Sequence, residues 1–364
     1  MRTRTVTLLT VLTLLIVACS GGGSDGSATT DAGADQPATT LASAEAVLLS
    51  YSLESGATYE YAVDLDQTIE MTATGDTTVM GGEGLPADLS IDVNGTSTFT
   101  HTVSEGPEPE TFEIHIVGDF SDLTFSGTID GEPVDESGIP DLAQVEPVDV
   151  TVVVDAQGNV IPESFEGIED GLFGDFGGLD MLQSLGGGSA ALGQFVGPPL
   201  SEDEVTVGDT WSETIEAPAL PGSDPVVTQV DSEVVAVEEL DGNEVFVIET
   251  TTTTSPIEFD LAQILVGFMT AFVPEDATDE ERAEIDALVE QLRFVVSVDA
   301  TVANLTTRFD PTDGLVKQAD LANTTHMVMD VNIPDETTGD LAAFAMDMTI
   351  TQDVTYRLTG SGSA

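Results

Sequence analysis

Regular alternation of apolar and polar residues is the feature that most constrains how this chain can fold. Residues 59–66 read Tyr-Glu-Tyr-Ala-Val-Asp-Leu-Asp, and residues 99–103 and 112–117 alternate in a similar way around a Gly-Pro-Glu-Pro turn at 106–109. A period of two places successive side chains on opposite faces of a strand. Runs of this kind, rich in Val, Ile, Thr and aromatic residues and separated by turn residues, predict a mainly β, antiparallel fold.

Two parts of the chain, about 150 residues apart, carry the same order of signals. Gly56-Ala57-Thr58-Tyr59 opens one series of strands, and Gly208-Asp209-Thr210-Trp211 opens another. Each series leads to a strand, an Asp-led turn with Gly and another strand, at 152–160 and 305–316. Two matches at nearly one offset indicate a duplication, whereas chance recurrence of hairpin chemistry is the alternative. We expect a first β repeat over 45–164 and a second over 205–360.

A pair of amphipathic helices is expected inside the second repeat. Apolar residues recur with helical spacing from 261 to 272 and again from 285 to 292. Ser255 with Glu258 could cap the first helix, and Thr278 with Glu281 has the form of a capping box for the second. The fold class is therefore mainly β (α+β): two similar halves of curved antiparallel sheet, with an amphipathic helical hairpin inserted over 257–293.

The segment between the repeats, 165–204, combines large apolar residues with many glycines. Each glycine costs a helix about 1 kcal/mol relative to alanine. The segment is therefore a connector between the repeats or a flap over an apolar surface, and the connector is the simpler interpretation.

The charge of the chain is extreme. Seven Lys and Arg residues face 67 Asp and Glu residues, which gives a formal net charge of −60. A field of this sign repels phosphate backbones and excludes nucleic acid as a partner. It repels anionic lipid headgroups as well, so surface charge cannot hold the protein at a membrane. Adaptation to saline water is our hypothesis for this acidity, and simple acidic drift in a secreted protein is the alternative.

Cys19, the only cysteine, lies at the end of a secretion signal. Arg2 and Arg4 precede an apolar stretch of about 13 residues, and small residues follow the cysteine. Ile16-Val17-Ala18-Cys19 resembles the lipobox of bacterial lipoproteins, in which the cysteine sulfur carries a diacylglycerol and the chain is cut before the cysteine. This resemblance implies a signal peptide over 1–18 and a lipidated Cys19 with a disordered tether over 19–44. Ordinary secretion with a free thiol is the alternative.

The lipobox resemblance also implies a location. The protein would lie on the extracytoplasmic face of the cell membrane, or on the outer membrane of a cell that has two. Its partner there would be the membrane itself, held through the lipid anchor.

Motifs for catalysis are missing from the sequence. There is no phosphate loop, no dinucleotide fingerprint and no nucleophile elbow, since the run 187–191 lacks the closing glycine. If the hairpin is centred near Pro107, His101 faces Glu113 with His115 diagonal to it, and the three could hold a metal. An ordinary polar hairpin face is the simpler interpretation. We expect no enzyme activity, no cofactor and no metal.

The lipobox, the polar tether, the long antiparallel strands and the helical hairpin together resemble the LolA-like and LppX/LprG-like bacterial lipoproteins. The runs 56–59, 207–211 and 310–316 are similar to those of uncharacterised actinobacterial lipoproteins. In the LolA-like and LppX/LprG-like families a curved, half-barrel-like sheet wraps around helices, and an apolar cavity between them carries a lipid.

This resemblance implies a lipid site between sheet and helices. Its lining would be Leu261, Leu265, Phe268, Met269 and Phe272, with Leu172, Phe173 and Phe176 as a flap. The alternative is that these residues simply fill the core. We expect a membrane-anchored, non-enzymatic lipoprotein that binds or carries a lipid or other apolar ligand. The other candidate is an envelope-structural or surface interaction lipoprotein with no small ligand.

Overall fold

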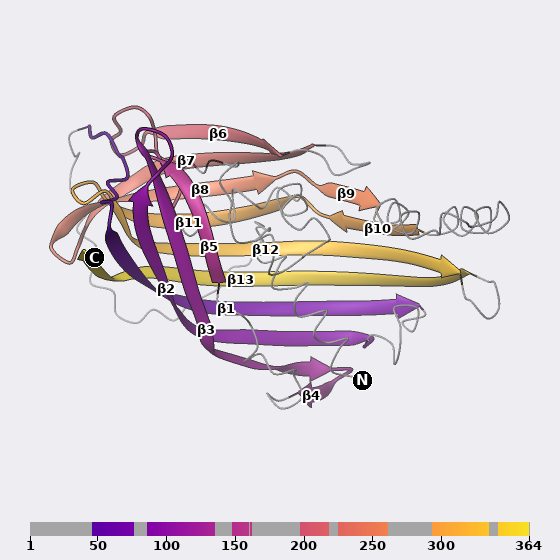
Figure 1. Cartoon of the computed structure of the whole chain (residues 1–364). Helices are drawn as coiled ribbons and strands as arrows, with labels where there is room; N and C mark the ends of the chain where they lie inside the picture. The colour runs from indigo at the N-terminus through magenta and orange to yellow at the C-terminus, as the bar shows by residue number, and fades with distance from the viewer. Residues whose placement is uncertain are drawn as a thin grey trace, which may run out of the picture.

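The described part of the chain is one large curved sheet that does not close on itself (Figure 1). The computed structural model describes residues 46–75, 86–134, 148–159, 161, 197–217, 225–260, 293–334 and 341–363. Within these residues all regular structure is β. The described residues therefore contain no candidate for a membrane-spanning helix. Every strand pair is antiparallel, which confirms the mainly β, antiparallel prediction.

Thirteen strands make up the sheet. They are β1 (Ala57–Gly75), β2 (Asp88–Glu105), β3 (Thr111–Ile129), β4 (Glu132–Val134), β5 (Val148–Asp155), β6 (Thr210–Ala217), β7 (Val226–Leu240), β8 (Asn243–Thr254), β9 (Ile257–Asp260), β10 (Arg293–Val298), β11 (Thr301–Asp310), β12 (Leu315–Pro334) and β13 (Leu341–Ser363).

The strand order is β4-β3-β2-β1-β13-β12-β11-β8-β7-β6. β5 lies beside β3, while β10 lies beside the later part of β12 and β9 beside β10. The succession β1, β2, β3, β5 has the same meander order as β6, β7, β8, β11. The duplication stays a prediction.

Alternation along β1 sets the two faces of the sheet. Its odd-numbered residues, from Ala57 to Ala73, are buried with the exception of the half-buried Leu65, whereas its even-numbered residues are half-buried or exposed. We call the first side the inner face and the second the outer face. Because neighbouring strands are in register, the same division holds across β13 and β12.

At one end of the sheet, strands from both halves contribute to a single core, which we call the packed end. It includes Val152 and Val154 of β5, Phe246 and Ile248 of β8, and Phe309 of β11. Two connecting segments, 46–53 and 197–205, also enter this core. They meet through paired backbone hydrogen bonds between Val47 and Val205, and the Tyr51 hydroxyl donates to the Pro198 carbonyl at 3.0 Å.

Both Asp-led turns predicted from the sequence form at the packed end. Asp155 accepts from the backbone of its own turn at 2.8–2.9 Å, and Asp310 does the same at 2.8–3.3 Å. Each turn also binds one residue of the segment 46–53. Tyr51 N donates to the Ala156 carbonyl, and Ser52 N donates to the Gly314 carbonyl. A Cβ added at Gly314 would lie 2.4 Å from Ser52 N, so only glycine allows this contact.

The predicted helical insertion over 257–293 is wrong at its start, whereas strands resume close to its predicted end. Residues 257–260 form β9 and residues 293–298 form β10, and the two strands pair with each other. The run Ile-Glu-Phe-Asp at 257–260 alternates with a period of two, which favours a strand. Ser255, expected as a helix cap, instead accepts from Val227 N at 3.0 Å. The predicted helices at 261–292 lie outside the described residues.

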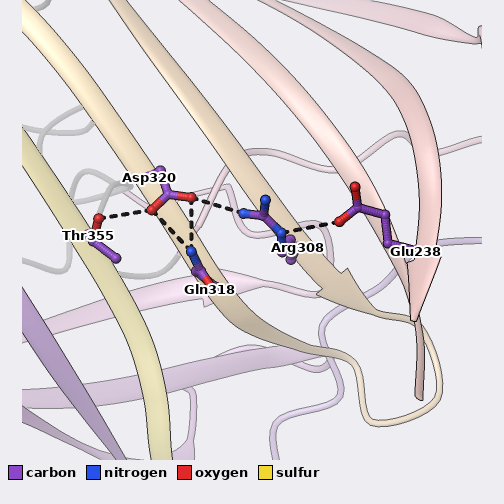
Figure 2. Close-up of polar contacts among 5 residues, drawn as sticks. All are labelled: Glu238, Arg308, Gln318, Asp320 and Thr355. Carbon is purple, nitrogen blue, oxygen red and sulfur yellow. Dashed lines mark hydrogen bonds and ion pairs between the residues drawn. The ribbon is translucent and has the colours of Figure 1, made fainter. Parts of the chain in front are cut away.

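A network of charged and polar side chains crosses the outer face (Figure 2). Arg308 of β11 donates from Nη1 to Asp320 of β12 at 2.9 Å and from Nε to Glu238 of β7 at 3.4 Å. Asp320 also accepts from Gln318 and from Thr355 of β13. One cation thereby links carboxylates on strands that are not neighbours in the sheet.

We predict that Arg308→Gln lowers the free energy of unfolding by about 1 kcal/mol at low salt, because two partly buried carboxylates lose their cation. The loss should shrink at about 1 M NaCl, where the Debye length falls to about 3 Å. Urea unfolding at both salt concentrations measures it. Arg357→Gln, at an exposed position on β13, removes the same charge and serves as the control. Equal losses in both variants would show that net charge, not this network, is responsible.

Candidate functional site

The inner face carries a second apolar cluster away from the packed end. One row of side chains crosses seven strands, and each residue of the row lies directly opposite the next one on the adjacent strand. The row consists of Ile129, Leu89, Met71, Met348, Met327, Val298 and Ile257. β1, β12 and β13, which form the middle of this row, extend to the right in Figure 1, past the end of β5. The sheet therefore presents a broad apolar face that is separate from the core of the packed end.

Methionine dominates the centre of this face. Five of the nine methionines of the chain lie there, and we call their surface the methionine face: Met71, Met327, Met329, Met346 and Met348. Met71 pairs with Met348, which pairs with Met327, and the next row pairs Met346 with Met329. Methionine is unbranched and polarisable, so it adapts to irregular shapes and is common at surfaces that accept varied apolar partners.

The methionine face is already buried in the protein. Its five side chains are between 1% and 6% exposed. An apolar ligand that binds here must therefore displace the groups that bury this face. Flexible methionine side chains lower the free-energy cost of repacking around such a ligand.

A row of buried polar residues separates the methionine face from the packed end, and we call it the polar belt. Its members lie on the inner face of six adjacent strands, β1, β13, β12, β11, β8 and β7. They are Gln67, Gln352, Asn323, Thr325, Thr301, Thr254 and Thr228. Polar residues are seldom fully buried without hydrogen-bond partners, so their partners decide what the belt can do.

Only part of the polar belt is internally hydrogen-bonded. Asn323 donates from Nδ2 to Gln352 Oε1 at 3.1 Å, and the hydroxyls of Thr228 and Thr254 are 3.3 Å apart. Three buried oxygens of the belt have no partner: Asn323 Oδ1, Thr301 Oγ1 and Thr325 Oγ1. A buried polar group left unpaired costs about 1–3 kcal/mol. The belt therefore has unused capacity to bind a polar group.

The surroundings of the polar belt are uncharged or negative. No belt residue is charged, and Arg308 is paired with Asp320 and Glu238 (Figure 2). On β6, Glu213 lies opposite Val230 of β7. Burial raises the pKa of Glu213, and the nearby charge of Asp155 raises it further. These groups give no cation to hold an anionic ligand.

The metal arrangement considered for the hairpin of β2 and β3 is wrong. Ser104, not His101, lies opposite Glu113, and His101 lies opposite Ile116. The loop is longer than a turn centred on Pro107, and this shifts the register by an odd number of residues, which reverses the faces. His101 is buried on the inner face, while His115 contacts Asp149 at 2.6 Å on the outer face. Among the described residues no group of His, Cys, Asp and Glu could hold a metal.

His101 lines a small recess of the packed end with Tyr51, Tyr59 and Tyr61. Its ring centroid is 4.7 Å from that of Tyr61. Burial lowers the pKa of His101 from 6.5 to about 4, so the imidazole is neutral at pH 7.

The structure does not test the lining residues predicted from the sequence. Leu261, Leu265, Phe268, Met269 and Phe272 lie outside the described residues, as do Leu172, Phe173, Phe176 and Cys19. The segment that carries the first five leaves β9 after Asp260 and returns at Arg293. β10 pairs with the part of β12 that carries Met327 and Met329, and β9 pairs with β10, so the described residues on both sides of this segment lie on this part of the sheet.

The methionine face and the polar belt were missed from the sequence. A signal was present, because methionines at 327 and 329 and at 346 and 348 are two residues apart in strands. Their convergence depends on the pairing of β12 with β13, which local patterns do not reveal.

Comparison with known proteins assigns no family. No protein-family model matches the chain, and no curated protein matches it. A structure of lipovitellin, described by its lipid–protein interactions, is 12% identical with a TM-score of 0.35 over 86% of this chain, which spans 26% of the lipovitellin chain. An outer membrane channel from Pseudomonas putida F1 is 8% identical over 85% of this chain and 97% of its own, with a TM-score of 0.20. Likenesses this weak carry no argument about function.

We predict that His101 makes the protein sensitive to acid. The unfolded state protonates near pH 6.5, whereas the folded state keeps the imidazole neutral down to about pH 4. Its contribution to stability is complete above pH 6.5 and is lost as the pH falls toward 4. Urea unfolding at about pH 7.5 and about pH 4.5 should show a loss about 2 kcal/mol smaller in His101→Phe than in the wild type.

The control for this prediction is His115→Gln, which alters the exposed histidine of the same hairpin. It should keep the full loss of stability on acidification. If His101→Phe loses as much stability as the wild type does, burial of His101 is not a source of the acid sensitivity.

Proposed function

We propose that this chain is an extracytoplasmic lipoprotein, anchored through acyl chains on Cys19, that binds an apolar ligand of the lipid class on its methionine face. Its role is non-enzymatic, either holding or carrying the ligand. The observation that carries the proposal is the apolar row across seven strands, with methionines at its centre.

The composition of the cluster supports ligand binding. A core that only has to be filled is best built from side chains with few rotamers, such as Leu, Ile and Val. The packed end follows this rule, since its buried cluster contains no methionine. The methionine face differs from such a core, because flexible methionines are concentrated there. Their flexibility would allow them to pack around ligands of variable shape.

The anchor part of the proposal rests on the sequence. Each acyl methylene buried in lipid contributes about 0.8 kcal/mol, and two or more chains give a stable attachment. With a net charge of −60, attraction to an anionic bilayer cannot replace those chains. The tether over 19–44 would let the sheet stand away from the headgroups, where a ligand could enter or leave.

The second candidate is an envelope-structural or surface interaction lipoprotein with no small ligand. One observation favours it, because the methionine face is already buried without a ligand. In that case the five methionines would only fill the core.

Binding of the uncharged apolar fluorophore 1-N-phenylnaphthylamine separates the two candidates. The full chain is extracted from membranes and freed of lipid, and the fluorophore is titrated into it. We expect saturable binding with a fluorescence increase in the wild type. Met348→Gln should weaken binding about tenfold, which corresponds to about 1.4 kcal/mol, because it places an amide at the centre of the face.

Thr349→Gln is the matched control, since Thr349 is the next residue of β13 and points to the outer face. It should bind like the wild type, and thermal unfolding checks that both variants fold. Lipid extracted with the untreated protein and identified by mass spectrometry gives an independent measurement. No fluorophore binding together with no co-purified lipid would reject ligand binding and leave the structural role.

A further inference from the structure

We infer that the ligand is an amphipathic lipid with an uncharged, hydroxyl-bearing head, such as glycerol or a sugar, and that the polar belt binds this head. The inference rests on the proposed function, because it assigns the polar end of a ligand whose apolar part lies on the methionine face. It is carried by three buried oxygens without partners: Asn323 Oδ1, Thr301 Oγ1 and Thr325 Oγ1.

These oxygens lie close together in the sheet. Asn323 and Thr325 are successive inner-face residues of β12. Thr301 begins β11 next to the pair Val302–Thr324, so its side chain lies level with Thr325 on the neighbouring strand. The three therefore form a compact group on two adjacent strands.

The group also lies at the right place for a lipid head. Along β12 the inner face continues from Thr325 directly to Met327, and two residues of a strand span about 7 Å. A chain lying on the methionine face would place its linked head beside Thr325 and Asn323. On β13, Gln352 occupies the same level as Asn323 and fixes the Asn323 amide through the 3.1 Å hydrogen bond.

The hydrogen-bonding chemistry selects the kind of head. One N–H of the Asn323 amide donates to Gln352, and the Asn323 oxygen, which can only accept, has no partner. The hydroxyls of Thr301 and Thr325 can donate or accept. A ligand hydroxyl can donate to Asn323 and accept from a threonine at the same time, whereas an ester or ether oxygen cannot donate.

The charge of the site excludes ionised heads. The polar belt contains no Lys, Arg or His that could pair with a phosphate or carboxylate, and no Asp or Glu that could pair with an ammonium group. A charge brought into this buried position would be unpaired, which costs far more than a neutral hydroxyl that forms hydrogen bonds.

Three probes with one oleoyl chain test this inference on the delipidated full chain. They are 1-oleoylglycerol, methyl oleate, which has no hydroxyl, and oleate, which is charged. Competition with 1-N-phenylnaphthylamine gives their affinities. We expect 1-oleoylglycerol to bind at least tenfold more tightly than either of the others.

Variants locate the preference at the belt. Asn323→Leu and Thr325→Val should bring the affinity for 1-oleoylglycerol down to about that for methyl oleate. Thr325→Val should also keep or raise the melting temperature without ligand, because it removes an unpaired buried hydroxyl. Thr324→Val, the adjacent residue on the outer face, is the matched control and should keep the preference.

The outcomes distinguish the two proposals. If methyl oleate or oleate binds as tightly as 1-oleoylglycerol, or if the variants keep the preference, the belt does not select the head and this inference is overturned, while ligand binding stands. If the fluorophore binds and none of the three displaces it, this inference is overturned too. If the fluorophore does not bind and no lipid co-purifies, the proposed function fails as well.

Discussion

The long antiparallel pairing of β1 with β13 joins the two ends of the described chain, and the sheet depends on it. It runs from the pair Ala57–Ser363 to the pair Gly75–Phe344, with one irregularity near Glu60. On one side of it lie β2 and β3, which follow β1 in sequence, and on the other lie β12 and the strands that precede it. Such a pairing closes a loop of nearly the whole chain, so it forms at a high entropic cost and is expected to be a late, slow step of folding. Both proposed binding surfaces require it, since it brings Met71 beside Met348 and Gln67 beside Gln352.

The inner face changes character along its length, and this change is the basis of the functional account. Tightly packed branched and aromatic residues fill the packed end, a polar belt follows, and methionines lie beyond it. The belt lowers the stability of the folded state, because three of its oxygens are buried without hydrogen-bond partners. Departures from well-satisfied burial are expected at functional sites, where a ligand supplies what the protein leaves open. The outer face, in contrast, carries exposed acidic residues such as Glu60, Asp64 and Glu70 of β1, and the Arg308 network pairs two further carboxylates there.

Period-two alternation was enough to predict the strands and their antiparallel class, because it records which face of each strand is buried. The register between strands was harder to predict. A loop slightly longer than assumed placed His101 on the opposite face from Glu113, and no local pattern revealed its length. The start of the predicted helical insertion was wrong, because Ile257-Glu258-Phe259-Asp260 suits a strand that pairs with residues about 40 positions later. The methionine face and the polar belt could not be found from the sequence, since each unites residues from both ends of the chain.

The most direct test is nuclear magnetic resonance of the protein carrying ¹³C-methyl methionine, with signals assigned by single Met→Leu variants. If the methionine face holds the ligand, adding 1-N-phenylnaphthylamine should shift the methyl signals of Met71, Met327, Met329, Met346 and Met348 together. At saturation all five should have moved to new positions, because the ligand contacts the face directly. If all five signals stay in place while the fluorophore is bound, the ligand lies elsewhere and the account of the inner face is contradicted.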